Sequence, residues 1–170
     1  VLPEMSANST AVLFADISGS TRLYSTLGDN AAQVVVNTCV TLMSNVVMRF
    51  KGRVVKTIGD EVMCVFRRAD DAAAAACEMQ EIIDAKRPAG QRVQIHIGMH
   101  YGTVLVESED VFGDTVNTAA FLRSKATGGQ ILISEATHHN LSPELKECAR
   151  EVFSTAIKGS TEMSMIYQLL

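Results

Sequence analysis

The sequence predicts an α+β fold with a ferredoxin-like βαββαβ core, an antiparallel sheet and a C-terminal α/β extension. Short apolar runs typical of buried strands alternate with longer segments in which apolar residues recur at helical spacing. Two of the strand-like segments are joined by the dipeptide Gly59-Asp60, which indicates a β-hairpin. A hairpin set between two helical segments favours an antiparallel sheet with the helices on one face.

The first half of the chain is expected to form the first strand, a long helix and the hairpin. The apolar run at 11–15 ends at Asp16, as expected of a buried strand, and small polar residues follow it as a turn leading into a helix. A long segment with helical spacing starts at Asp29 and ends before Gly52. In order, we expect a tail or linker at 1–9, a strand at 11–16, a turn at 18–21, a helix at 29–50, and hairpin strands at 53–58 and 61–66.

The second half is expected to complete the core and add the extension. An alanine-rich helix begins at Asp70 and ends before Pro88. In order after it, we expect strands at 92–100 and from 104, a helix at 115–125, a strand at 131–133, a helix at 135–140, and strands at 152–157 and 163–169. Because no repeat or second linker is found, we expect residues 10–170 to form one domain.

Composition excludes several classes of protein. The 170 residues are 47% hydrophobic and 20% charged, which is typical of a globular domain. The net charge of −4 argues against nucleic acid as a partner. The four cysteines form no C-x-x-C motif, which suits a reducing, cytoplasmic location. No apolar run approaches the length of a membrane span, so no membrane contact is expected of this domain.

Two acidic residues stand where predicted strands end. Asp16 closes the first strand and Asp60 lies in the hairpin turn, and these strands are sheet neighbours in a ferredoxin-like core. Their carboxylates are therefore able to converge on a hard divalent ion. The alternative for either residue alone is ordinary turn chemistry. The small polar residues 18–21 favour an anion site at a helix start, although serine and threonine also cap helices generally.

Four ordered blocks carry a family resemblance. They are FADISGST at 14–21, KTIGDE at 56–61, GMHYG at 98–102 and DVFGDTVN at 110–117. Together they resemble the class III nucleotidyl cyclases of the bacterial adenylyl type, and the resemblance extends over about residues 10–168. It implies that residues 10–170 are a nucleotide cyclase catalytic domain.

The resemblance also implies roles for single residues. Asp16 and Asp60 match the aspartates that hold two Mg²⁺ or Mn²⁺ ions, with the Ile17 carbonyl as a further ligand. Lys56 and Asp110 match the pair that reads the base, and these two residue types suit adenine. Gly19, Ser20 and Thr21 match the loop that holds the triphosphate. Asn117 matches the residue that orients the ribose, and Lys158 matches a triphosphate-binding lysine near the C-terminus.

One position departs from the family pattern. A transition-state arginine is expected one helical turn after Asn117, where this chain has Phe121. Arg123 lies about 200° around an ideal helix from Phe121 and is expected to point away. The loss of such a donor costs about 10²–10³ in rate. Arg22 and Lys125 are the alternative cations, and the sequence does not place either of them.

The predicted function is conversion of ATP to 3′,5′-cyclic AMP and pyrophosphate, at active sites shared across a head-to-tail homodimer, with activity reduced by Phe121. The alternatives are a catalytically impaired nucleotide-binding regulatory module and a guanylyl cyclase. A diguanylyl-type enzyme is disfavoured because the chain lacks its G-G-[DE]-E-F loop. The start of the chain, without methionine, leads us to expect a regulatory or sensor domain elsewhere in a longer protein.

Overall fold

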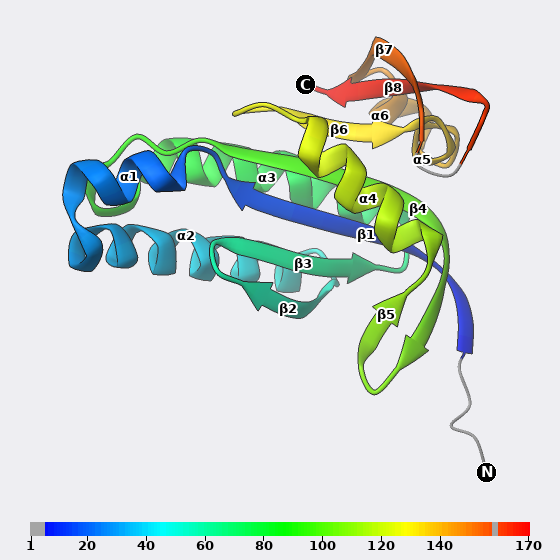
Figure 1. Cartoon of the computed structure of the whole chain (residues 1–170). Helices are drawn as coiled ribbons and strands as arrows, with labels where there is room; N and C mark the ends of the chain where they lie inside the picture. Colours follow the sequence, from blue (N-terminus) through cyan, green and yellow to red (C-terminus); the bar gives the residue numbers. More distant parts are fainter. Residues whose placement is uncertain (1–5, 158–159) are drawn as a thin grey trace.

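Eight strands form one sheet in the computed structural model, which describes residues 6–157 and 160–170 (Figure 1). The strand order is β2-β3-β1-β4-β6-β8-β7, and β5 pairs with β4. The strands are β1 (Ser6–Ile17), β2 (Arg53–Ile58), β3 (Glu61–Phe66), β4 (Ile95–Glu107), β5 (Asp110–Phe112), β6 (Ile131–Ser134), β7 (Ala149–Ala156) and β8 (Met163–Leu169). The pairings β2-β3, β3-β1 and β1-β4 are antiparallel, which confirms the predicted core.

The helices lie on both faces of this sheet. They are α1 (Ser20–Leu27), α2 (Asp29–Arg49), α3 (Ala69–Lys86), α4 (Asp114–Lys125), α5 (Glu135–His139) and α6 (Pro143–Lys146), with a short 3₁₀ turn at Pro88–Gly90. In Figure 1, α4 lies in front of the sheet and α3 behind it. The expectation that the helices share one face is therefore wrong for α4.

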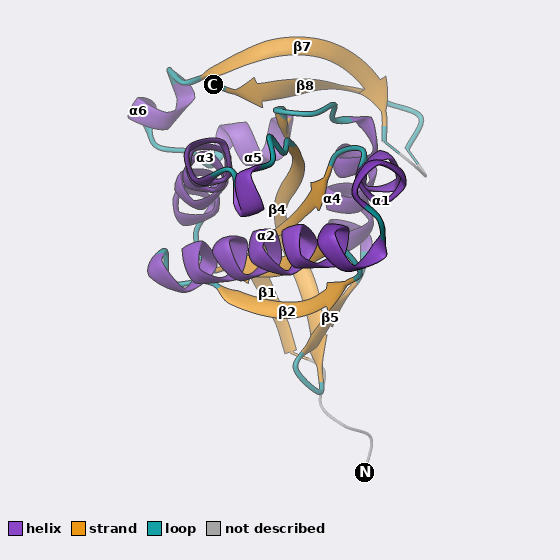
Figure 2. Ribbon diagram, turned by 90° about the vertical axis from the view of Figure 1, so that its left-hand side faces the viewer, coloured by secondary structure: helices purple, strands orange, loops and turns teal. Residues whose placement is uncertain are grey.

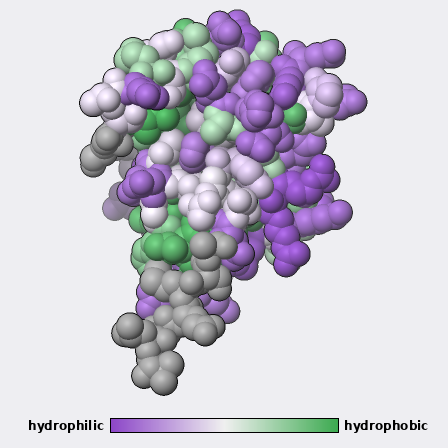
Figure 3. Space-filling model, turned by 90° about the vertical axis from the view of Figure 1, so that its right-hand side faces the viewer, coloured by the Kyte–Doolittle hydropathy of each residue, from purple (hydrophilic) through white to green (hydrophobic). Residues whose placement is uncertain are grey.

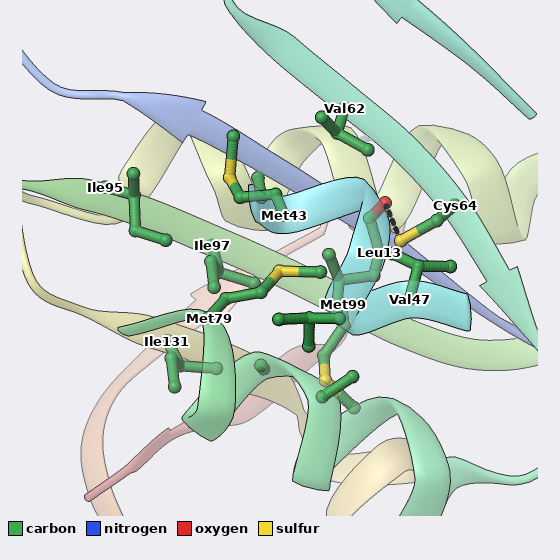
Figure 4. Packing of buried hydrophobic residues seen from close by; sticks show 14 of the residues in the cluster. Leu13, Met43, Val47, Val62, Cys64, Met79, Ile95, Ile97, Met99 and Ile131 are labelled. Carbon is green, nitrogen blue, oxygen red and sulfur yellow. Dashed lines mark hydrogen bonds between the residues drawn. The ribbon is translucent and has the colours of Figure 1, made fainter. Parts of the chain in front are cut away.

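The alternation of β1 explains the two faces. Leu13 and Ala15 pack with α2 and α3, whereas Val12 and Phe14 pack with Ala119 of α4. Every residue of β3 is buried, as a strand covered on both faces requires. Figure 4 shows the larger cluster, in which Met43 and Met79 meet sheet residues such as Leu13.

The C-terminal extension widens the sheet. Strand β6 pairs in parallel with β4, and β8 and β7 continue antiparallel beyond it. Figure 2 shows β7 and β8 at the far side of the molecule from β2. This arrangement confirms the predicted extension, while α6 and β5 were not predicted.

Two predicted boundaries are wrong. The tail was placed at 1–9, but β1 begins at Ser6 and its first five residues pair with Gly102–Val106 of β4. Polar side chains such as Asn8 remain exposed there while the sheet satisfies the backbone groups. The strands expected at 92–100 and from 104 form one strand, β4. Gly102 does not break it; a glycine is needed there because a Cβ would lie 2.5 Å from Thr115 Oγ1.

Helix α2 is, by length and composition alone, apolar enough to cross a membrane, so the expectation that no segment is long enough is wrong for Asp29–Arg49. It is the one such helix among the residues searched. Seven of its residues, including Cys39 and Met43, are buried against the sheet and α3. Packing in the hydrophobic core therefore accounts for the apolar residues of α2.

Candidate active site

The hairpin turn brings two aspartates together at the end of β1. Asp16 pairs with Glu61 of β3 in the sheet register, so that Asp60, one residue before Glu61, lies beside it. Burial raises the pKa of Asp16 to about 6, and the neighbouring carboxylate of Asp60 adds to this. Asp16 Oδ1 is buried and has no hydrogen-bond partner among the described residues.

These features fit a divalent cation. A buried carboxylate oxygen without a partner, facing a second carboxylate, is an oxygen donor set of the kind that Mg²⁺ and Mn²⁺ bind. Within the part of the chain that the structure covers, no group of three or more histidine, cysteine or acidic side chains is placed so that it could hold a metal ion. Ile17 follows Asp16 at the end of β1, and its carbonyl remains a predicted ligand.

A histidine also lies beside Asp16. His96 lies opposite Asp16 on β4, with its Nε2 3.6 Å from Asp16 Oδ2. Its Nδ1 lies 2.7 Å from Ser18 Oγ. Burial lowers the pKa of His96, and the charge of Asp60 partly opposes this. The register of β1 with β4 places His96 beside Asp16, although the two residues are far apart in sequence.

Arg123, in the last turn of α4, contacts the hairpin. Its guanidinium forms an ion pair with Glu61 and lies 5.5 Å from the centroid of the Phe14 ring. Its positive charge lowers the pKa of Asp16, against the effect of burial. This close approach depends on Gly98, where a Cβ would lie 2.1 Å from the backbone nitrogen of Arg123. Arg123 thus points away from Phe121, as expected, but toward a partner that sequence reasoning missed.

The predicted phosphate loop opens α1. Gly19 is the N-cap residue with φ of 72°, a left-handed conformation that favours glycine, and no side chain caps the helix. Ser20 and Thr21 form its first turn. The loop borders a cleft of about 490 Å³ lined also by Arg22 and Arg92. Exposed amides next to cationic side chains suit an anionic ligand.

Lys56 and Asp110 meet although they are 54 residues apart in sequence. Lys56 Nζ donates to Asp110 Oδ2 at 3.1 Å, and Asp110 Oδ1 accepts from the Val111 amide at 2.8 Å. These bonds, led by that of Val111, lower the pKa of Asp110. Arg53 Nη1 donates to the Glu109 carbonyl at 2.8 Å, which ties the β4–β5 turn to β2. The predicted base-reading residues therefore form one polar pair between β2 and β5.

Two of the remaining predicted residues, Asn117 and Phe121, lie on α4. Asn117 and Phe121 line a cavity of about 550 Å³ together with Asp114 and Ile157. Phe121 is half-buried against a small apolar cluster that includes Leu122. Lys158, the predicted triphosphate lysine, lies outside the described residues.

Comparison with known proteins identifies the family of the chain. A family model described as "Adenylate and Guanylate cyclase catalytic domain" matches residues 2–170. A curated adenylate cyclase of Streptomyces griseus is 33% identical over 153 residues, 87% of this chain and 38% of the relative. The chain spans about a third of the length of the curated relatives it matches.

Solved structures agree on the fold. The adenylyl cyclase CyaB from P. aeruginosa superposes with a TM-score of 0.87 at 24% identity, covering 99% of this chain and 96% of that one. The catalytic core of a rhodopsin-guanylyl cyclase with converted specificity, in complex with ATPalphaS, gives a TM-score of 0.88 at 25% identity and 98% coverage of both chains. The chain belongs to the family of class III adenylate and guanylate cyclase catalytic domains.

Proposed function

We propose that this domain converts ATP into 3′,5′-cyclic AMP and pyrophosphate. The observation that carries the proposal is the meeting of Asp16, which has a buried and unpartnered oxygen, with Asp60 at the hairpin turn. That donor set suits two Mg²⁺ or Mn²⁺ ions, which when bound would activate the ribose 3′-hydroxyl and offset charge on the phosphates. The curated relatives named adenylate cyclase support the same activity.

The chain's own residues would bind and orient the substrate. The exposed amides at Gly19, Ser20 and Thr21 would hold the triphosphate, with Lys158 as a further cation. Asn117 would orient the ribose so that its 3′-oxygen lies in line with the α-phosphorus, and pyrophosphate leaves from the opposite side.

Base selection rests on the Lys56–Asp110 pair. A lysine donates to an acceptor on the base, and a carboxylate accepts from an exocyclic amine, which is the pattern that adenine presents. The two side chains lie 3.1 Å apart and are only half-buried, so that a base can compete for both. This pair favours ATP over GTP and argues against the guanylyl alternative.

We further propose that the active sites are shared across a head-to-tail homodimer. Apolar surface gathers in the lower part of Figure 3, at the level of the β4–β5 hairpin in Figure 1. Leu105 on β4 and Phe112 on β5 are 39% and 44% exposed, and Ile58 at the end of β2 is 54% exposed. Exposed apolar side chains close to predicted substrate residues suit burial against a second copy.

The presence of Phe121 favours reduced cyclase activity, because an aromatic ring has no positive charge with which to stabilise a phosphoryl transition state. The same substitution favours a second candidate function, a catalytically impaired module that binds nucleotide and transmits a signal. The share of the curated relatives' length that this chain spans leaves room for a regulatory or sensor domain in the full protein. The four cysteines, all free, suit a reducing compartment such as the cytoplasm.

A cyclase assay separates these candidates. We expect cyclic AMP from ATP with Mn²⁺ or Mg²⁺, little product from GTP, and a rate per chain that rises with protein concentration. Nucleotide binding without any turnover would instead identify the impaired module, and a preference for GTP would identify a guanylyl cyclase. A rate per chain independent of concentration down to nanomolar protein, together with a monomeric mass, would contradict the shared site.

A further inference from the structure

The cavity on α4 contains polar and aromatic groups but lacks a cation among its described lining residues. Its lining consists of Asp114, Asn117, Thr118, Ala120, Phe121 and Ile157. Transfer of a phosphoryl group builds negative charge on oxygen atoms, and fixed cationic donors stabilise that charge. A cyclase site that uses Asn117 therefore needs a positive group close to this face of α4.

Lys125 is a positive group on the side of α4 that carries Asn117 and Phe121. Asn117, Phe121 and Lys125 follow one another at intervals of four residues on α4 and therefore share one side of the helix. Lys125 Nζ lies 5.4 Å from the centroid of the Phe121 ring, in a cation–π arrangement. Within residues 6–157 and 160–170, Lys125 makes no ion pair, and it is exposed.

Two other cations among the described residues, Arg123 and Arg22, contact other groups. Arg123 forms its ion pair with Glu61 and lies against Phe14, on the side of α4 that faces the hairpin. Arg22 lines the separate cleft beside the phosphate loop. Of the two alternatives that the sequence left open, the geometry therefore favours Lys125.

We propose that Lys125, held over the ring of Phe121, is a catalytic residue. Its ammonium donates hydrogen bonds to the phosphoryl oxygens and stabilises their negative charge in the transition state. This inference rests on the proposed cyclase function. The Phe121 ring acts as a platform that limits the conformations of the lysine side chain, and burial of the ring against the Leu122 cluster fixes the platform. No bond to Lys125 forms or breaks, and its three N–H groups only donate hydrogen bonds.

A lysine in this role is a partial substitute for an arginine. The ammonium is a compact charge on a flexible stem, whereas a guanidinium presents a planar fork that binds two oxygens at once. A well-placed donor of this kind is worth about 10²–10³ in rate. We expect Lys125 to raise the rate about tenfold, which is only part of the factor that an arginine would supply.

The test is a double-mutant cycle with cyclic AMP production as the readout. Lys125→Gln is expected to lower kcat about tenfold with little change in KM for ATP, and Lys125→Arg to retain the rate. Lys86→Gln is the matched control, since Lys86 is also an exposed lysine in the last turn of a helix, and it is expected to change nothing. Phe121→Arg is expected to raise kcat about tenfold more in the Lys125→Gln background than in the natural chain, because the two cations fill one role.

Each other result has a defined meaning. Unchanged kcat in Lys125→Gln, or an equal effect of Phe121→Arg in both backgrounds, would overturn the role of Lys125 and leave the cyclase function standing. A fall in kcat accompanied by a lower midpoint of thermal unfolding, not rescued by Lys125→Arg, would show a structural role instead and overturn the proposal. Absence of turnover in every variant, Phe121→Arg included, would overturn the proposed function and this inference together.

Discussion

Asp16→Asn is expected to stabilise the metal-free protein while removing its affinity for metal. Asp16 is partly buried, its Oδ1 has no partner among the described residues, and Asp60 faces it with a like charge. An amide of nearly the same shape carries no charge and can donate a hydrogen bond to Asp60. The variant therefore removes an unfavourable interaction that the natural protein tolerates for function.

The magnitude follows from the pKa of Asp16. This pKa rises from 3.8 to about 6, and a tenfold change in proton affinity is worth about 1.4 kcal/mol, so the charged form costs up to about 3 kcal/mol in the folded state. Because the pKa is raised, the natural protein has its full stability from this group below pH 4 and loses it as the pH rises through 6. We expect Asp16→Asn to gain about 1–2 kcal/mol at pH 8, since a buried amide retains part of the desolvation cost, and nothing at pH 4.

The assay is urea unfolding at pH 8 and pH 4, with and without Mn²⁺ and 3′-deoxy-ATP, which lacks the attacking hydroxyl. Ligand at one hundred times its Kd stabilises the natural protein by about 2.7 kcal/mol, and the variant is expected to gain far less. Asp84→Asn, which removes an exposed carboxylate from α3, is the control. A variant less stable than the natural protein at pH 8, or equally stabilised by Mn²⁺, would refute the reasoning.

Three further predictions follow from the same geometry. Asp60→Ala is expected to abolish cyclic AMP production at unchanged molecular mass in solution, and retained activity would rule out Asp60 as a metal ligand. Lys56→Glu combined with Asp110→Cys is expected to reduce the preference for ATP over GTP by an order of magnitude or more in kcat/KM, because the 3.1 Å pair is replaced; an unchanged preference would show that other groups read the base. Gly98→Ala is expected to lower the free energy of unfolding by about 1–3 kcal/mol, since the new Cβ would meet the Arg123 backbone nitrogen at 2.1 Å; an unchanged urea midpoint would contradict this packing.

Local patterns predicted the elements well where one physical signal dominated. The hairpin strands Arg53–Ile58 and Glu61–Phe66 agree with their predicted bounds, because Gly59 adopts φ of 60° in the turn between two apolar strands. Helix α2 agrees within one residue at its C-terminal end, where its apolar spacing stops before Gly52. Strand β4 was predicted as two pieces, because Gly102 looks like a break in sequence although it makes room for Thr115.

The predicted site was partly within reach of sequence reasoning. Asp16 and Asp60 were placed together because the fold class makes their strands neighbours, and the register of β1 with β3 confirms it. The contacts of His96 and Arg123 were not predicted, because they depend on the register of β1 with β4 and on the face of the sheet that α4 covers. Both depend on long-range packing, which a local pattern does not contain.

By itself, the sequence determined the order of the elements, the family resemblance and the residue types available for metal, phosphate and base. Periodicity, turn residues and short motifs are local properties of the sequence, so they can be identified without knowledge of the fold. Only the tertiary structure decided that α4 crosses the second face of the sheet, that Arg123 pairs with Glu61, and that Lys125 lies over Phe121. The reason is that these relations depend on which side chains meet once Gly98 lets α4 approach β4, and that approach is a property of the packed chain.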